Sequence, residues 1–181
     1  MRRIAITLFL IAMTLFLPLV STAQGRSPSF DGVPLRGDAM VVSGALRAKG
    51  WSLVEAADHV VVLKGSWKGF QDVKVTVLES DDGAAVASLT ALVPVSADWP
   101  TMTAAWEDVV DAGVKAWGPA ERIRTRILVT GDFSDEEKPM LVQDGRCEWK
   151  ATWTLNHGEA VTDLAFLPFS YYVRTVITIK R

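Results

Sequence analysis

Apolar residues recur at every second position along much of this chain, and this period of two constrains the fold more than any other feature. Val73, Val75 and Val77 alternate with polar residues, as a half-buried β-strand requires. The apolar run at 60–67 precedes them and the run at 84–95 follows them, each separated from them by a glycine-containing turn signal. The sequence therefore predicts an antiparallel meander of three strands between residues 60 and 95.

Two segments follow the helical period of 3.6 residues instead. Residues 38–49 have Asp38 as a candidate N-cap and end before Gly50. The stronger pattern starts after Asp98 and stops at Gly118. Its continuous apolar face consists of Met102, Trp106, Val109, Val110, Gly113 and Trp117.

Strand patterns resume after the second helix, at 122–129, 146–155, 160–167 and 171–180, with an acidic segment at 131–144. Antiparallel strands grouped beside helices favour an α+β fold with two helices packed on one face of the sheet or sheets. A helix and three strands are followed by a longer helix and about four strands. This order is compatible with a degenerate tandem α-β-β-β repeat.

The N-terminus has the three zones of a secretory signal peptide. Arg2 and Arg3 precede an apolar run at 4–20, and small residues follow as far as Ala23. Cleavage after about Ala23 is predicted, with a retained membrane anchor as the alternative. No cysteine lies near this site, so we expect a periplasmic or secreted protein without a lipid anchor and without a stable membrane span. The expected organisation is a signal peptide at 1–23, a flexible lead-in at 24–29 and one globular domain at 30–181.

The composition argues against nucleic acid as a partner and against an internal disulfide as a source of stability. The formal net charge is −2, and loss of the two leader arginines makes it about −4, which argues against a nucleic-acid partner. Cys147 is the single cysteine, so the domain cannot form an internal disulfide. An exported domain of this kind must rely on its apolar core, to which the seven tryptophans can contribute large buried areas.

A cysteine and a histidine could form a nucleophile and its base, but their spacing argues against it. Cys147 shares one side of a predicted strand with Trp149 and Trp153, so its thiol is expected to face the core. His157 follows in a turn. With His59 as the other histidine, the chain offers few zinc ligands. We predict no catalytic residue, no cofactor and no metal ligand.

The acidic segment contains candidate oxygen ligands for calcium. Asp132, Asp135, Glu136 and Glu137 are potential oxygen ligands, but they lack the alternating spacing around a glycine that a calcium loop requires. Ser134 followed by Glu137 fits the capping box of a short helix instead.

An arginine row is the one candidate binding feature on the surface. Arg122, Arg124 and Arg126 alternate along a predicted strand, so their side chains emerge on one face while the intervening residues turn inward. Three guanidinium groups could bind a phosphate or carboxylate. The alternative is that a carboxylate on a neighbouring strand, such as Glu79 or Glu148, pairs with them.

The tryptophans raise the separate possibility of carbohydrate binding, because aromatic faces stack on sugar rings. Trp106, Trp117, Trp149 and Trp153 fall on apolar faces and are expected in the core. Trp51, Trp67 and Trp99 are less determined by the pattern.

Several short motifs resemble those of small exported proteins of unknown function from Bacteroides-type bacteria. They are GVPLRG at 32–37, KGW at 49–51, LKGSWKGF at 63–70, WGP at 117–119 and DGRCEW at 144–149. The layout is also faintly similar to envelope modules such as the outer-membrane assembly lipoprotein fold and β-lactamase inhibitor repeats. The resemblance implies an exported α+β protein and supplies no catalytic residues.

The function that follows is a non-enzymatic periplasmic or secreted binding module for a protein or an anionic envelope ligand. The alternative is a glycosidase-like hydrolase of envelope polymers that uses carboxylates such as Glu159 or Asp163.

Overall fold

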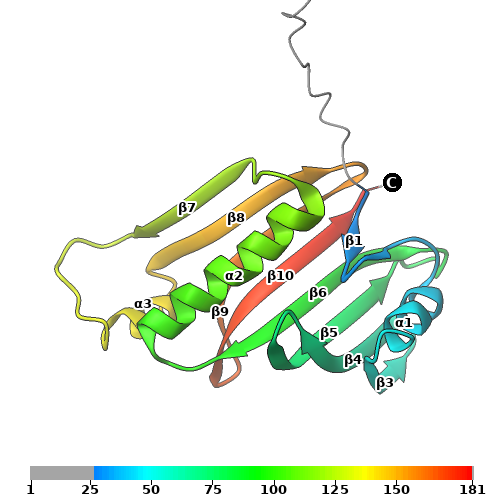
Figure 1. Cartoon of the computed structure of the whole chain (residues 1–181), viewed down its shortest axis with the longest axis horizontal. Helices are drawn as coiled ribbons and strands as arrows, with labels where there is room; N and C mark the ends of the chain where they lie inside the picture. The colour runs from blue at the N-terminus through cyan, green and yellow to red at the C-terminus, as the bar shows by residue number, and fades with distance from the viewer. Residues whose placement is uncertain (1–26, 181) are drawn as a thin grey trace, which may run out of the picture.

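The computed structural model describes residues 27–180, so the predicted signal peptide and residues 24–26 of the predicted lead-in lie outside the described residues. The architecture is mostly β: strands account for 47% of the described residues and helices for 22%. One sheet of eight antiparallel strands forms the body of the molecule, beside a small two-stranded sheet (Figure 1). No helix within residues 27–180 has the length and apolar character needed to cross a membrane.

The elements fall into two successive groups along the chain. The first group is β1 (Ser29–Phe30), β2 (Val33–Pro34), α1 (Ala39–Arg47), β3 (Ser52–Ala57), β4 (Val60–Trp67), β5 (Phe70–Glu79) and β6 (Val86–Val95). The second group is α2 (Trp99–Trp117), β7 (Arg122–Ile127), α3 (Lys138–Gln143), β8 (Cys147–Leu155), β9 (Gly158–Leu167) and β10 (Ser170–Ile179). The order in the large sheet is β3-β4-β5-β6-β10-β9-β8-β7, so β3 and β7 are its outer strands.

The predicted fold class, α+β with two helices packed on one face of the sheet, is wrong. The described chain is mostly β with three helices, and four strands rather than three follow the first helix. The missed strand is β3, whose residues are all exposed and whose sequence SLVEAA has no apolar alternation to reveal it. The tandem α-β-β-β description fails for the same reason.

Several individual elements occur where the pattern predicted them. The predicted strand at 60–67 is β4, and Val73, Val75 and Val77 of β5 are each 0% exposed. Asp98 caps α2 by accepting a hydrogen bond from the Thr101 N–H at 3.0 Å. The period of two and the helical stripe were therefore sufficient to locate the central elements.

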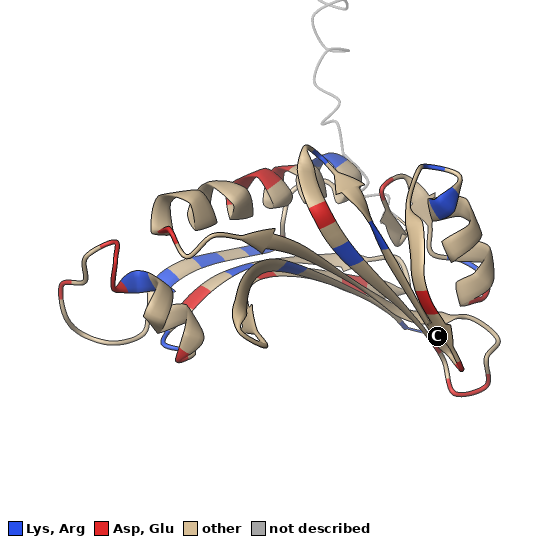
Figure 2. Ribbon diagram, turned by 90° about the horizontal axis from the view of Figure 1, so that it is seen from below, with Lys and Arg blue, Asp and Glu red and all other residues tan. Residues whose placement is uncertain are grey.

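The large sheet has two unlike faces. Helices α1 and α2 lie against the same face, as the two views together show (Figures 1 and 2). Alternate strand residues point the opposite way, and we call that surface the open face. Its residues in the six central and C-terminal strands include Lys74, Thr76, Thr90, Leu92, Lys150, Val161, Asp163, Arg174 and Val176. Most of them are only partly buried.

Helix α2 is seated on the sheet by Trp153 of β8. Trp153 is 1% exposed, and its indole N–H donates to the Gly118 carbonyl at 3.0 Å. A Cβ atom at Gly113 would lie 2.8 Å from the Trp153 ring. Only glycine at this position therefore lets the helix approach the ring so closely. Trp117 completes the contact with an edge-on ring arrangement at 5.3 Å from Trp153.

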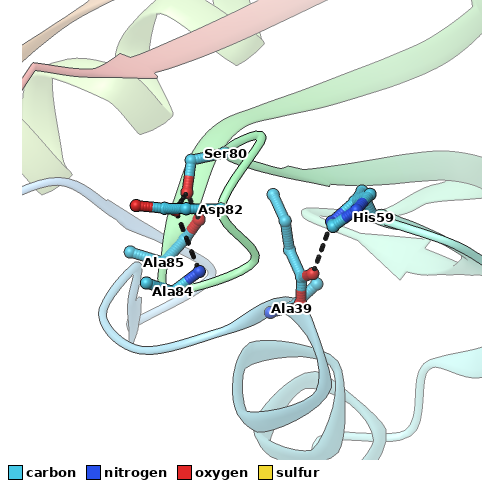
Figure 3. A network of polar contacts seen from close by, with 7 residues as sticks. Ala39, His59, Ser80, Asp82, Ala84 and Ala85 are labelled. Carbon is cyan, nitrogen blue, oxygen red and sulfur yellow. Dashed lines mark hydrogen bonds and ion pairs between the residues drawn. The ribbon is translucent and has the colours of Figure 1, made fainter.

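Helix α1 buries Val42 and Leu46 in the core, and a carboxylate at the end of β5 binds its N-terminus. The Ala39 N–H, in the first turn of the helix, donates to Glu79 Oε1 at 2.7 Å, and His59 Nδ1 lies 3.3 Å from Glu79 Oε2 (Figure 3). Asp38 adds a local cap by accepting from the Val41 N–H at 2.8 Å. A negative side chain at this position both satisfies a helix N–H and interacts favourably with the helix dipole.

Replacing Glu79 with alanine should weaken the attachment of α1. We expect Glu79→Ala to lower the free energy of unfolding by about 1–2 kcal/mol, because one helix N–H loses its acceptor and the dipole loses its counter-charge. Urea unfolding followed by circular dichroism measures this loss. Glu107→Ala, an exposed substitution on α2, is the matched control and should change the value by less than about 0.5 kcal/mol. Equal effects of the two substitutions would contradict the assigned role of Glu79.

Candidate functional site

The arginine row lies on β7, one of the two outer strands of the large sheet. Figure 1 shows β7 along the upper rim, beside β8. It pairs with β8 without a register shift from Arg122 to Ile127. The other outer strand, β3, has a register shift between Leu53 and Glu55. An outer strand directs alternate backbone N–H and C=O groups away from the sheet, so β7 offers an unbroken edge of such groups.

Two of the three arginines share one carboxylate of the neighbouring strand. Arg124 Nη1 donates to Glu148 Oε1 at 3.1 Å, and Arg126 Nε donates to Glu148 Oε2 at 2.9 Å. The hydrogen bond from Arg124, with a further contribution from Arg126, lowers the pKa of Glu148 from its usual value. The cross-strand pairing considered from the sequence thus occurs with Glu148. Glu79 bonds to Ala39 and His59 instead.

Arg122 differs from the other two arginines. Among residues 27–180 it forms no ion pair with a carboxylate. It faces a shallow depression of about 190 Å³ on the open face. The depression is lined by Arg122, Arg124, Glu148, Lys150, Thr152, Glu159 and Val161. Lys150 and Thr152 were not singled out from the sequence, although their alternation along β8 opposite the arginines was a usable signal.

The other side of β7 is apolar and more exposed than the sequence predicts. Ile123, expected to turn inward, is 54% exposed, and Thr125 is exposed as well. Ile127 is partly buried. The side chains of an outer strand are covered by a neighbour on one side only, and here no second strand follows β7 in the sheet. The rim of the sheet therefore carries cations on one face and an apolar side chain on the other.

Cys147 and His157 do not come together. Cys147 is the first residue of β8, whereas His157 lies beyond its last residue in the turn to β9. A strand of nine residues spans roughly 30 Å. Cys147 packs beside Trp99, Met102 and Val142, and burial raises the pKa of its thiol to about 11.

The carboxylates considered for hydrolysis are both close to cations. Asp163 accepts two hydrogen bonds from Arg174, at 2.9 and 2.6 Å. Glu159 lies 3.8 Å from Lys180 Nζ. The pairing with Arg174 raises the pKa of that guanidinium and fixes the Asp163 side chain across β9 and β10.

The acidic segment contains a short helix, α3, but Ser134 and Glu137 do not form its predicted capping box. The Ser134 N–H donates to Glu137 Oε2 at 2.8 Å in the turn that precedes α3, and the N-cap of α3, Glu137, makes no side-chain capping hydrogen bond. Asp135 pairs with Lys138 at 2.7 Å. Glu137 and Asp135 therefore interact with residues of the same segment.

Comparison of the chain with known protein families, with characterised proteins and with solved structures finds no match. The resemblance to small exported proteins of Bacteroides-type bacteria stays a prediction.

The raised pKa of Cys147 gives a direct test of its environment. At pH 8 a pKa of about 11 leaves roughly a hundredfold less thiolate than the ordinary thiol pKa of 9.0 does. We expect labelling by a thiol-specific disulfide reagent to be slowed by about this factor in the native protein, and to become fast in urea. A short cysteine-containing peptide is the control. Native labelling as fast as that of the peptide would contradict the burial of the thiol.

Proposed function

We propose that this protein is an exported, non-enzymatic binding module that takes up an extended, acidic segment of another protein as an additional strand beside β7. The observation that carries the proposal is the coincidence, on one strand, of an unbroken outer edge and a row of three arginines. Export is part of the proposal and is supported by the signal-peptide pattern at the N-terminus.

The backbone of β7 supports strand addition. Peptide recognition of this kind uses main-chain hydrogen bonds for affinity and alternate side chains for specificity. β7 keeps its register over six residues, which is the usual length of a strand. The outer strand β3 is less suitable, because the register shift at Leu53 and Glu55 interrupts its edge.

The side chains of β7 select the kind of strand. A segment paired with β7 would place alternate side chains beside the arginines and the others beside Ile123, which is 54% exposed. Guanidinium groups bind carboxylates through two parallel hydrogen bonds. The complementary partner therefore alternates acidic and apolar residues.

The depression on the open face supplies a place for one of the acidic side chains. Arg122 and Lys150 both line it, and within the described part of the chain neither forms an ion pair. Glu148 already occupies Arg124 and Arg126. A partner carboxylate would bind first at Arg122 and Lys150, and would compete with Glu148 for the other two arginines.

Because Glu148 competes with the partner carboxylate, one substitution should weaken peptide binding and another should strengthen it. The probe is a peptide of about eight residues that alternates Glu and Val, matched in length to a typical strand. We expect Arg122→Glu with Arg126→Glu to weaken binding by at least about tenfold, since each charge-assisted hydrogen bond contributes about 1.5–3 kcal/mol. Glu148→Gln should strengthen binding, because it removes the internal competitor. Calorimetric titration measures both changes.

The controls separate strand addition from general attraction of charge. Lys64→Glu with Lys74→Glu makes the same charge change elsewhere on the open face and should leave affinity unchanged. A peptide with N-methylated backbone keeps its carboxylates but loses N–H donors, and it should not bind. Thermal melts confirm that each variant is folded. Equal binding of the methylated peptide, or equal loss in the lysine control, would refute strand addition at β7.

A further inference from the structure

A second concave site lies on the helix-bearing side of the sheet, away from the arginine row. It is a groove of about 430 Å³ between the β1–β2 hairpin, the turn from β4 to β5 and the C-terminal half of α2. Figure 1 shows β1, whose residues line the groove, between α2 and α1. Its volume falls within the range typical of small-molecule sites.

Cations from three separate elements surround the groove. Lys49 follows α1, Lys68 lies in the β4–β5 turn and Lys115 is in the last turn of α2. Lys49 Nζ is 3.4 Å from the position of a Cβ atom built on Gly32, which places its ammonium group at the hairpin turn. Neither Lys49 nor Lys68 forms an ion pair within the described part of the chain.

One acidic side chain lines the groove, and it is already engaged. Asp31 Oδ2 accepts a hydrogen bond from the Trp51 indole N–H at 3.2 Å. Lys49 and Lys68, against this one engaged carboxylate, leave an excess of positive charge around the groove. The ligand that complements it is an anion.

The walls between these cations are aromatic and rigid. Phe30 and Trp67 have ring centroids 5.0 Å apart, and Trp117 forms the facing wall from α2. Ala112, Gly113 and Ala116 line the groove along the helix beside Trp117. Trp67 is 7% exposed and offers the groove only an edge, whereas the partly buried Trp117 offers more aromatic surface. Aromatic surfaces of this kind contact flat apolar groups.

Two hydrogen bonds hold the walls in place. The Trp117 indole N–H donates to the Ser29 carbonyl at 3.2 Å and so joins α2 to the hairpin. The Trp51 bond to Asp31 fixes the turn of the same hairpin. Trp67 differs, because its indole N–H is buried and has no acceptor among the described residues.

We propose that this groove binds a small anionic molecule that carries a flat apolar ring, with the ring against Trp67 and Trp117 and the anionic group at Lys49 and Lys68. This site is independent of the proposed strand addition at β7, because it uses other residues on the opposite face of the sheet. It needs no catalytic chemistry, and aromatic carboxylates and phosphate monoesters of phenols both fit the description.

Phenyl phosphate is the probe, because it combines a ring with a dianion. Phenol carries only the ring and inorganic phosphate only the anionic group, so these two compounds are the matched controls. We expect phenyl phosphate to bind at least about tenfold more tightly than inorganic phosphate, and phenol not to bind detectably. Calorimetry measures the affinities, and quenching of the fluorescence of the seven tryptophans, which include Trp67 and Trp117, is a second readout.

Variants assign the binding to this groove. Lys49→Gln with Lys68→Gln should weaken phenyl phosphate binding by about tenfold or more. Lys64→Gln with Lys74→Gln removes the same charge from the open face and should have no effect. Arg122→Glu with Arg126→Glu should also leave the binding intact, which separates this site from β7. Equal affinity for phenyl phosphate and inorganic phosphate, or an unchanged affinity in the Lys49 and Lys68 variant, would overturn the proposal, as would the absence of saturable binding at millimolar concentrations.

Discussion

The pairing of β6 with β10 is the interaction on which the rest of the structure depends. The two strands are paired from Ser88↔Thr178 to Val95↔Tyr171, although a long stretch of chain separates them. This contact joins the β3–β6 meander to the β7–β10 meander in one sheet. Because the junction uses the last strand of each meander, the first strands, β3 and β7, become the outer strands. The exposed edge at the arginine row is thus a consequence of the central pairing.

The same junction determines where the helices can lie. Leu89, Val173 and Ile177 are each 0% exposed on the helix-bearing side of the central strands. Trp153 and Gly113 seat α2 over the C-terminal part of the sheet, while Glu79 fastens α1 near the N-terminal part. The β1–β2 hairpin lies between the two helices (Figure 1). The cationic groove is therefore built from segments that the sheet brings together and that are far apart in the sequence.

The sequence predicted those parts of the structure that depend on local pattern. The strand at 60–67, the alternation of β5 and the capped apolar stripe of α2 are properties of neighbouring residues, and the structure has them. β3 was missed because it packs at an edge, where no burial imposes alternation. Its omission contributed to the wrong fold class, since an eight-stranded sheet needs that strand.

Of the two candidate sites, one could be predicted from local sequence pattern and the other could not. The arginine row and its possible partner Glu148 were visible, because a period of two on adjacent strands suffices to place them. The groove was not visible, since it requires Ser29 to meet Trp117 across 88 residues. The helical position of Trp117 predicts that it lies in the core, and it is partly buried there. Its second role, as a wall beside Lys49 and Lys68, follows only from the tertiary arrangement.

The distribution of charge explains how an acidic chain can present two cationic sites. The net charge is −2, yet the acidic side chains near β7 and the groove have partners: Glu148 pairs with two arginines, Glu159 lies beside Lys180, Glu121 accepts from Thr154 and Asp31 accepts from Trp51. Exposed charges interact over a screening length of about 8–10 Å at physiological ionic strength, which is close to the distance between packed layers. The sheet stands between the arginine row and the groove. Acidic groups elsewhere on the surface therefore have little influence at either site, and an anion bound at one should leave the affinity of the other nearly unchanged.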